Sequence, residues 1–173
     1  MQTKRRSLLK IGVLGGIALA AGGAWYRRGQ DTPPGRFALD GEARAVLAAI
    51  IPALLDPLLP AQDVPRAAAI ASTTDAVRQA INSLPLATQK EVQDLFGLLA
   101  LAPARRFLAG VPAAWSEATP QQVSAFLQDW RLHRLGMLQS AYHALHDLVL
   151  GAWYAQPASW AGIGYPGPIK ELS

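Results

Sequence analysis

A length of 173 residues allows one domain with a substantial core and is short for two. The net charge of +4 comes from the N-terminus: residues 1–30 contain six basic and no acidic residues, whereas residues 31–173 contain ten basic and all twelve acidic ones. A mildly acidic body argues against the basic surface that nucleic acids require, so no nucleic-acid partner is expected. The absence of cysteine excludes thiolate metal sites, disulfides and cysteine nucleophiles.

The first 30 residues have the pattern of a twin-arginine export signal. A basic segment precedes an apolar run over residues 11–26, in which five glycines keep the hydrophobicity moderate. The residues that match the twin-arginine consensus are Arg5, Arg6, Leu8, Leu9 and Lys10. We therefore expect the twin-arginine translocase to carry the folded chain to the periplasm. The alternative is an uncleaved anchor in the inner membrane, because about 16–18 apolar residues approach the length of a spanning helix.

The remaining chain divides into three predicted segments. Two prolines and two glycines within residues 29–38 prevent regular structure there. Apolar residues then recur at helical spacing as far as Tyr154, and a stretch rich in proline, glycine and aromatic residues follows. The predicted segments are a linker over residues 31–39, a helical domain over residues 40–155 and an extended C-terminal tail over residues 156–173.

Two helices are predicted in the first half of the helical domain. Asp40 has a suitable side chain to cap the first helix, and three prolines, beginning with Pro52, are expected to break the chain after it. The second helix is predicted over about residues 66–82, where Val77 and Ile81 belong to a series at helical spacing.

Three more helices are predicted in the second half. Thr88 and Glu91 have the spacing of a capping box, which opens a helix that stops near Pro103. Thr119, followed by a proline, opens the next helix. The last and longest covers about residues 134–154, where apolar residues recur at spacings of three and four. Because no segment alternates with a period of two for long enough to form a strand, the predicted fold class is all-α, a small helical bundle.

The C-terminal tail combines residues that prevent a helix with residues that avoid water. Pro166, Pro168 and three glycines limit it to one helical turn at most. Trp160, Ile163 and Tyr165 are costly to leave in water. We therefore expect the tail to pack either on its own bundle or on another protein.

No motif in the chain indicates catalysis or a resident cofactor. Glycine-rich dinucleotide loops, phosphate-binding loops and haem-attachment cysteines are absent from the sequence, and its carboxylates are scattered singly. The spacing that best suits a metal is that of His143 and His146, which stand three residues apart with Asp147 beside them. We predict no independent enzyme activity and no cofactor in this chain, and keep a metal site at the two histidines as a minor alternative.

The C-terminal third carries a distinctive set of residues. They are Trp130-Arg131, the helix up to Tyr154, Gln156-Pro157, Trp160 and Ile163-Gly164-Tyr165-Pro166-Gly167-Pro168. With the N-terminal signal and a first helix that ends in Ile50-Ile51-Pro52, these residues resemble the gluconate 2-dehydrogenase subunit 3 family. Residues 60–118 match that family only in being helical. Family members often contain cysteines, and this chain contains none.

The family consists of small, twin-arginine-signalled subunits that accompany flavin-dependent dehydrogenases of the glucose–methanol–choline type. The resemblance implies a non-catalytic subunit that supplies the export signal and assists maturation of a large dehydrogenase subunit, which holds FAD and the catalytic residues. A cytochrome c subunit is a further expected partner. The residues expected to contact the partner, as aromatic and proline anchors, are Trp153, Tyr154, Trp160, Tyr165, Pro166 and Pro168.

Two other functions are compatible with the same sequence. One is a membrane-anchored structural protein that docks a dehydrogenase or a cytochrome, in which case the segment up to Tyr26 is retained in the mature protein. The other is an independent periplasmic ligand-binding or metal-binding helical protein that uses His143 and His146.

Overall fold

Every regular element in residues 36–167, the part of the chain that the computed structural model describes, is a helix. The α-helices are α2 (Gly41–Leu55), α3 (Asp63–Asn82), α4 (Leu86–Ala100), α5 (Ala102–Phe107), α6 (Pro120–Arg131) and α7 (Gly136–Tyr154). Single turns of 3-10 helix are η1 (Trp115–Glu117), η2 (Pro157–Ser159) and η3 (Ala161–Ile163). The predicted all-α helical bundle is therefore confirmed.

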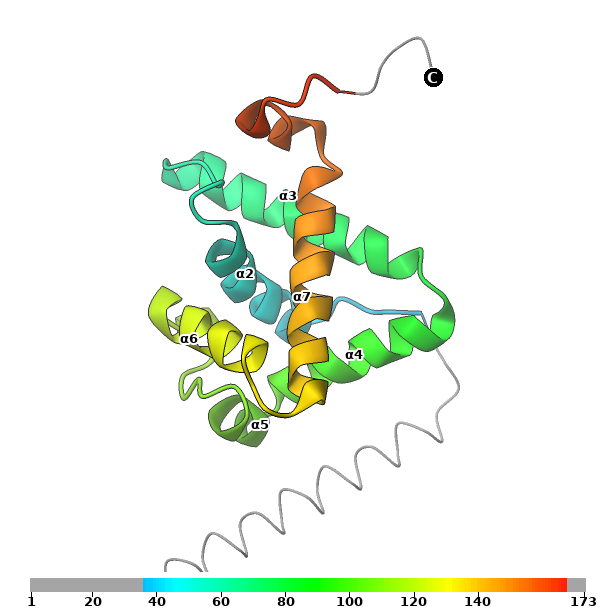
Figure 1. Ribbon diagram of the computed structural model, residues 1–173, viewed down its shortest axis with the longest axis vertical. Helices are drawn as coiled ribbons and strands as arrows, with labels where there is room; N and C mark the ends of the chain where they lie inside the picture. Colours follow the sequence, from blue (N-terminus) through cyan, green and yellow to red (C-terminus); the bar gives the residue numbers. More distant parts are fainter. Residues whose placement is uncertain (1–35, 168–173) are drawn as a thin grey trace, which may run out of the picture. The chain divides into compact units, whose positions relative to one another are not determined.

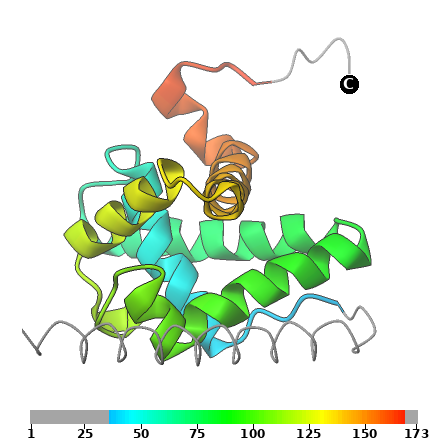
Figure 2. The same cartoon turned by 60° about the horizontal axis from the view of Figure 1, so that its bottom comes forward.

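Helix α2 lies at the centre of the bundle. It contacts α3, α4, α6, α7 and η1, while α7 crosses α3 as well (Figures 1 and 2). Val46, Leu47, Ile50 and Ile51 of α2 are all buried. Because neighbouring residues of a helix point about 100° apart, these side chains face more than one direction. A helix that is apolar on several sides needs neighbours around most of its circumference, which explains the central position of α2.

The start of α2 agrees with the sequence, but its end does not. Asp40 caps the helix, as predicted, by accepting a hydrogen bond from the Ala43 amide at 2.7 Å. Pro52 is predicted to break the helix, yet the helix continues to Leu55. The proline removes the amide that would bond the Ala48 carbonyl. Since Ala48 is exposed, water can hydrate that carbonyl, and the helix tolerates the proline in its last turn.

The predicted capping box at Thr88 and Glu91 is wrong, because α4 already begins at Leu86. Pro85 stands immediately before the helix, where its fixed backbone angle suits the start of a turn and its missing amide costs nothing. The polar side chain that organises this turn is Gln89. It is buried, and its amide group donates to two main-chain carbonyls of the preceding turn at 2.8 and 3.2 Å.

Part of the predicted linker belongs to the folded domain. Phe37 is buried, and its ring packs against an aromatic ring of α4 with the centroids 5.9 Å apart. The amides of Phe37 and Ala38 donate to the side-chain oxygens of Gln89 and Gln93, each at 2.9 Å. These two residues are therefore held by α4, although the sequence assigns them to the linker over residues 31–39. Residues 31–35 of that linker lie outside the described part of the chain.

The predicted start of α6 is confirmed. The Thr119 hydroxyl accepts from the Gln122 amide at 3.2 Å, and the Gln122 side chain accepts from the Thr119 amide at 3.0 Å. Further along α6, the indole N–H of the buried Trp130 donates to the Leu108 carbonyl at 2.9 Å. This bond holds the residue after α5 against the end of α6. Helix α5 is absent from the sequence-based prediction because six residues are too few to display a period.

Helix α7 matches the predicted last helix closely. It has 19 residues and is thus one residue shorter than α3, which begins at Asp63 rather than near residue 66. The residues of α7 that face the core are Leu138, Tyr142, Leu145, Val149 and Ala152. They repeat at spacings of three and four, as a packed helix requires. Among the helices of residues 36–167, none combines the length and apolar character needed to cross a membrane.

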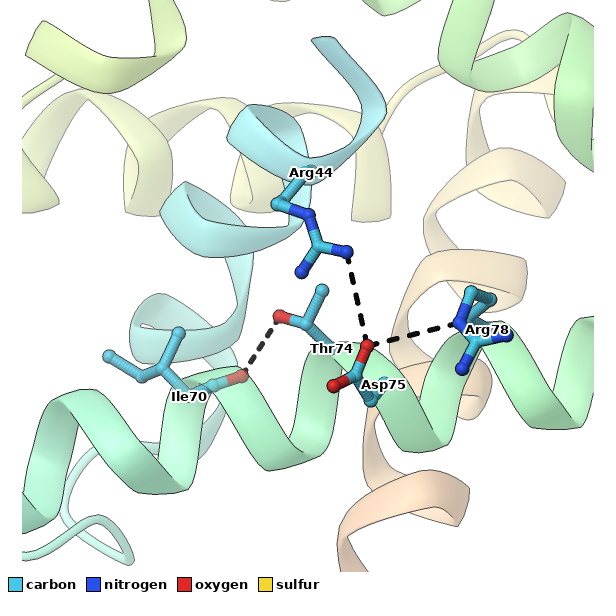
Figure 3. A network of polar contacts seen from close by, with 5 residues as sticks. All are labelled: Arg44, Ile70, Thr74, Asp75 and Arg78. Atoms are coloured by element: carbon cyan, nitrogen blue, oxygen red, sulfur yellow. Dashed lines mark hydrogen bonds and ion pairs between the residues drawn. The ribbon is translucent and has the colours of Figure 1, made fainter. Parts of the chain in front are cut away.

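Figure 3 shows polar contacts within α3 and between α3 and α2. The hydroxyl of Thr74, a buried residue, donates to the Ile70 carbonyl one turn earlier at 2.8 Å, so no polar atom of that side chain is left unpaired. Next to it, Asp75 lies between Arg44 of α2 and Arg78 of α3, with N–O distances of 3.9 and 3.8 Å. These side chains are partly exposed, so the ion pairs add little to stability, although they neutralise charge on this side of the bundle.

Candidate partner-binding site at the C-terminal tail

The C-terminal tail folds back around Trp160. The indole N–H of Trp160 donates to the Tyr154 carbonyl, at the end of α7, at 2.8 Å. The Trp160 carbonyl accepts from the Tyr165 amide at 3.0 Å, and the two rings meet edge to face with their centroids 5.3 Å apart. Such an edge-to-face pair is a favourable aromatic geometry. Trp160 therefore links the end of the last helix to the chain that follows it.

The prediction of an extended tail is wrong for the residues between Gln156 and Tyr165. They form η2 and η3, each a single turn, which is the most that the prolines and glycines allow. Gly164 ends η3 with a φ of 69°, a left-handed conformation that glycine adopts without strain, and so returns the chain to Trp160. Gly167 passes close to the same indole, because a Cβ atom placed there would lie 3.2 Å from the ring.

The start of the tail is attached to the bundle through Gln156. Its side-chain amide donates to the Ala152 carbonyl of α7 at 3.1 Å and to the Thr73 hydroxyl of α3 at 3.4 Å. Ser159 is buried next to it, and its hydroxyl donates to the Gln156 carbonyl at 2.8 Å. Of the two predicted alternatives, packing on its own bundle thus holds for the first turn of the tail.

The second half of the tail presents apolar side chains to the surface. Tyr154, Ile163 and Tyr165 are 38%, 51% and 46% exposed, and Pro166 is exposed beside them. We call these four residues the C-terminal aromatic surface. Large apolar side chains held in fixed positions at a surface are typical of sites that bind another protein. The Trp160 side chain bonds the Tyr154 carbonyl and packs against the Tyr165 ring, so these parts of the surface are held by contacts within the chain itself.

The structure separates the residues predicted to contact a partner. Tyr154, Tyr165 and Pro166 belong to the C-terminal aromatic surface, and Trp160 supports it. Trp153 is half-buried and packs against the core of the bundle instead. Pro168 lies outside the described residues, as do the export-signal residues Arg5, Arg6, Leu8, Leu9 and Lys10.

Ile163 belongs to the surface, although it is absent from the predicted contact residues. The sequence does contain a signal for it. Ile163 is the one aliphatic residue larger than alanine among the small, proline and aromatic residues 157–167, which cannot form a core of their own.

The histidine pair on α7 does not gather further ligands. His143 is exposed, and Nδ1 of His146 lies 2.9 Å from a carboxylate oxygen of Asp147. Both imidazole rings lie against the ring of Tyr142, with centroid distances of 5.3 and 5.6 Å. Within residues 36–167, no three side chains of His, Asp or Glu come together in a way that could hold a metal ion. In the described part of the chain, His143 thus contacts Tyr142, and His146 contacts Tyr142 and Asp147.

An open groove of about 570 Å³ lies between α2 and the start of α6. Its walls are mostly alanine and proline, with two serines, Ser116 and Ser124. No histidine lines the groove beside these serines, and the one carboxylate in its lining is that of Asp56. The groove also contains the ion pair between Asp56 and Arg66, at 3.4 Å.

Comparison with family models, with curated proteins and with solved structures finds no match for this chain. The resemblance of the C-terminal third to gluconate 2-dehydrogenase subunit 3 therefore stays a prediction from its residues. The site with the clearest physical character in the described part of the chain is the C-terminal aromatic surface.

Proposed function

We propose that the chain is a non-catalytic subunit that escorts a flavin-dependent dehydrogenase to the periplasm and binds it through the C-terminal aromatic surface. The observation that carries this proposal is the exposure of Tyr154, Ile163 and Tyr165 around a fixed Trp160. Covering large apolar side chains fully gains about 1.5–3 kcal/mol for each, so three half-exposed ones are a substantial reserve of binding energy.

The tail is also organised in advance. The bond of Trp160 to the end of α7 and the bonds of Gln156 to α3 and α7 hold its backbone. A partner therefore has few residues to order on binding, which lowers the entropic cost of association. A loose tail with the same composition would bind more weakly.

The proposed division of labour explains the combination of sequence features. The chain supplies a signal for the export of folded proteins, but its sequence has no motif for a cofactor. The large subunit supplies FAD and the catalytic residues, and a cytochrome c subunit is the expected electron acceptor. The small chain thus gives its signal to a partner that must acquire FAD before export.

The export role is tested with a double substitution in the signal. Arg5→Lys and Arg6→Lys together are expected to leave both this chain and the dehydrogenase in the cytoplasm. The measurement is flavin-dependent dehydrogenase activity in the periplasmic fraction of the native bacterium, with and without the substitutions. Normal periplasmic activity in a strain that lacks this chain contradicts the proposal.

The binding role is tested with the full chain carrying Ile163→Ser and Tyr165→Ser. We expect this variant to reach the periplasm without the flavoprotein, so that the flavin absorbance of the affinity-purified chain is lost. A matched control is the pair Val64→Ser and Leu86→Ser, which changes two exposed apolar residues elsewhere on the bundle. Equal loss of flavin in both variants contradicts a role for the C-terminal aromatic surface.

The mass of the mature chain separates export from anchoring. Cleavage within the first 30 residues supports a released periplasmic subunit. Retention of the segment up to Tyr26 supports the membrane-anchored docking protein instead, with the same binding surface.

A further inference from the structure

Two segments that are distant in the sequence lie toward the N-terminal end of α7 in Figure 1. One is α5, and the other is the connection from the end of α6 into the first turn of α7, over residues 131–137. The Trp130 indole N–H, next to the second segment, donates to the carbonyl of Leu108, the residue that follows α5. Figure 1 places both at the end of α7 opposite to the C-terminal tail, and Figure 2 views α7 nearly along its axis.

These two segments are basic. Helix α5 and residues 131–137 contain four arginines and no aspartate or glutamate, and the nearest carboxylates along the chain are Asp94, Glu117, Asp129 and Asp147. The arginines are Arg105, Arg106, Arg131 and Arg134. None of them forms an ion pair with a carboxylate within residues 36–167, in contrast to the arginines on either side of Asp75. The Nε atom of Arg105 is buried with no hydrogen-bond acceptor in the same part of the chain.

Apolar side chains project from the same two segments. Phe107 at the end of α5, Leu132 after α6 and Met137 in the first turn of α7 are 78%, 76% and 72% exposed. They are among the most exposed large apolar residues in the described part of the chain, and arginines precede each of them by one to three residues. We call α5 and residues 131–137 the basic apolar surface.

We infer that the basic apolar surface docks on an anionic phospholipid bilayer. Apolar side chains that project singly can enter the boundary between headgroups and acyl chains. Arginines beside them remain at the level of the phosphates and are attracted by anionic headgroups. A protein partner would more often require a continuous apolar face or a pocket, whereas these residues alternate with cations. This contact is independent of the export role, since it uses other residues at the other end of α7.

The test uses the full chain with a fluorescent label. Since the sequence contains no cysteine, a thiol-reactive dye will attach only to a cysteine that is introduced. A single cysteine at Met137→Cys carries an environment-sensitive dye within the basic apolar surface. A second protein, with Ser72→Cys on the exposed side of α3, reports any attachment that occurs through another part of the chain. The probes are vesicles of equal parts phosphatidylglycerol and phosphatidylcholine, and vesicles of phosphatidylcholine alone.

With anionic vesicles, we expect the dye at position 137 to shift to shorter wavelength and the dye at position 72 to remain unchanged. Neutral vesicles are expected to produce no shift at either position. Raising the salt from about 0.1 M to about 1 M shortens the Debye length from about 10 Å to about 3 Å, so the shift at position 137 is expected to fall.

A charge-matched pair of variants isolates the role of the arginines. Arg106→Gln, Arg131→Gln and Arg134→Gln together are expected to raise the anionic lipid needed for half of the shift by about tenfold or more. The control replaces Arg36, Arg44 and Arg78 by Gln, which changes the net charge equally and is expected to leave the titration unchanged. All six side chains are at least partly exposed, so both variants are expected to keep their helical circular dichroism.

Several results would overturn the inference. One is the absence of a shift at position 137 on anionic vesicles, which would leave an acidic protein as the better occupant. Another is an equal shift at positions 72 and 137, which would assign vesicle binding to another part of the chain. A third is an equal increase, in the two arginine variants, of the anionic lipid needed for half of the shift. Vesicle binding would then depend on the net charge of the chain and not on the position of the arginines.

Discussion

The bundle and the C-terminal tail contain the same two kinds of hydrogen bond, one from a tryptophan indole and one at a glutamine side chain, but the bonds have different consequences in the two regions. In each, an indole N–H bonds a main-chain carbonyl: Trp130 bonds Leu108 at 2.9 Å, and Trp160 bonds Tyr154 at 2.8 Å. In each, a glutamine amide joins segments that are distant in the sequence. Gln89 does so between α4 and Phe37, and Gln156 does so between the tail and α3.

The difference between the two regions lies in burial. Trp130 is 1% exposed and lies within the main core, whereas Trp160 is half-exposed and its ring packs on residues of its own tail. A buried group that loses its partner is cut off from water, but an exposed one is rehydrated. The buried Trp130 side chain should therefore matter to global stability, whereas the Trp160 side chain should matter only to local order in the tail.

The largest effect is expected from Trp130→Ala. Removal of a buried indole leaves a cavity against Phe126, whose ring centroid lies 4.8 Å away, and should lower the free energy of unfolding by about 3–5 kcal/mol. Urea unfolding of the full chain, followed by far-ultraviolet circular dichroism, measures this change. Trp130→Phe is the control, because it keeps a six-membered ring in the core and removes the N–H donor together with the five-membered ring. A loss below about 1 kcal/mol for the alanine variant would show that the core does not depend on this residue.

Gln89→Ala is expected to have the second largest effect. Gln89 is 3% exposed, and its side chain bonds the Phe37 amide and two carbonyls of the preceding turn. Without it, buried main-chain groups lose their partners, which should cost about 1–3 kcal/mol by the same urea measurement. Gln93→Ala is the matched control on the same helix, since its bond to Ala38 is exposed. A greater loss from the control would contradict the importance of burial.

Trp160→Ala is expected to change global stability by less than about 1 kcal/mol, because its contacts lie within the tail and at the end of α7. Its effect should appear locally, as faster proteolytic cleavage within residues 155–167. The same variant should weaken flavoprotein binding, since Trp160 holds the C-terminal aromatic surface. An unfolding midpoint that falls as far as that of Trp130→Ala would remove the distinction between the two regions.

Gln156→Ala is expected to have the smallest effect, about 0.5 kcal/mol. Its bond to the Thr73 hydroxyl is long, at 3.4 Å, and its groups are only partly buried, so water replaces the lost contacts. Amide hydrogen exchange in η2 should nevertheless accelerate, while exchange in α3 stays unchanged. If the amides of η2 exchange at the same rate before and after the substitution, other contacts hold the tail.

The length of α7 relates the two proposed contact surfaces. Its 19 residues span about 28 Å at 1.5 Å per residue, and the surfaces lie at its opposite ends. A partner at the C-terminal aromatic surface and a bilayer at the basic apolar surface can therefore be bound at the same time. The net charge of residues 31–173 does not indicate the basic apolar surface, because carboxylates elsewhere in these residues balance its arginines in number.

Much of the fold could be predicted because its causes are local. The cap of α2 at Asp40, the capping box at Thr119 and the spacing of core residues along α7 each depend on a few neighbouring residues, and each prediction is confirmed. The residues of the C-terminal aromatic surface could also be selected as a group, because prolines and glycines prevent them from forming a helix with a core of its own.

What the tertiary structure decided involves groups that are distant in the sequence. Whether Pro52 ends α2 depends on how the fold exposes Ala48, and the start of α4 includes a buried Gln89 that accepts from the distant Phe37 amide. Phe37 is held in the core by a bond to a residue 52 positions away. The residue after α5 is held at the end of α6 by a bond that spans 22 residues. The helix propensities of most residues differ by less free energy than it costs to leave a buried polar group unpaired. Distant contacts that pair such groups therefore override the local propensities.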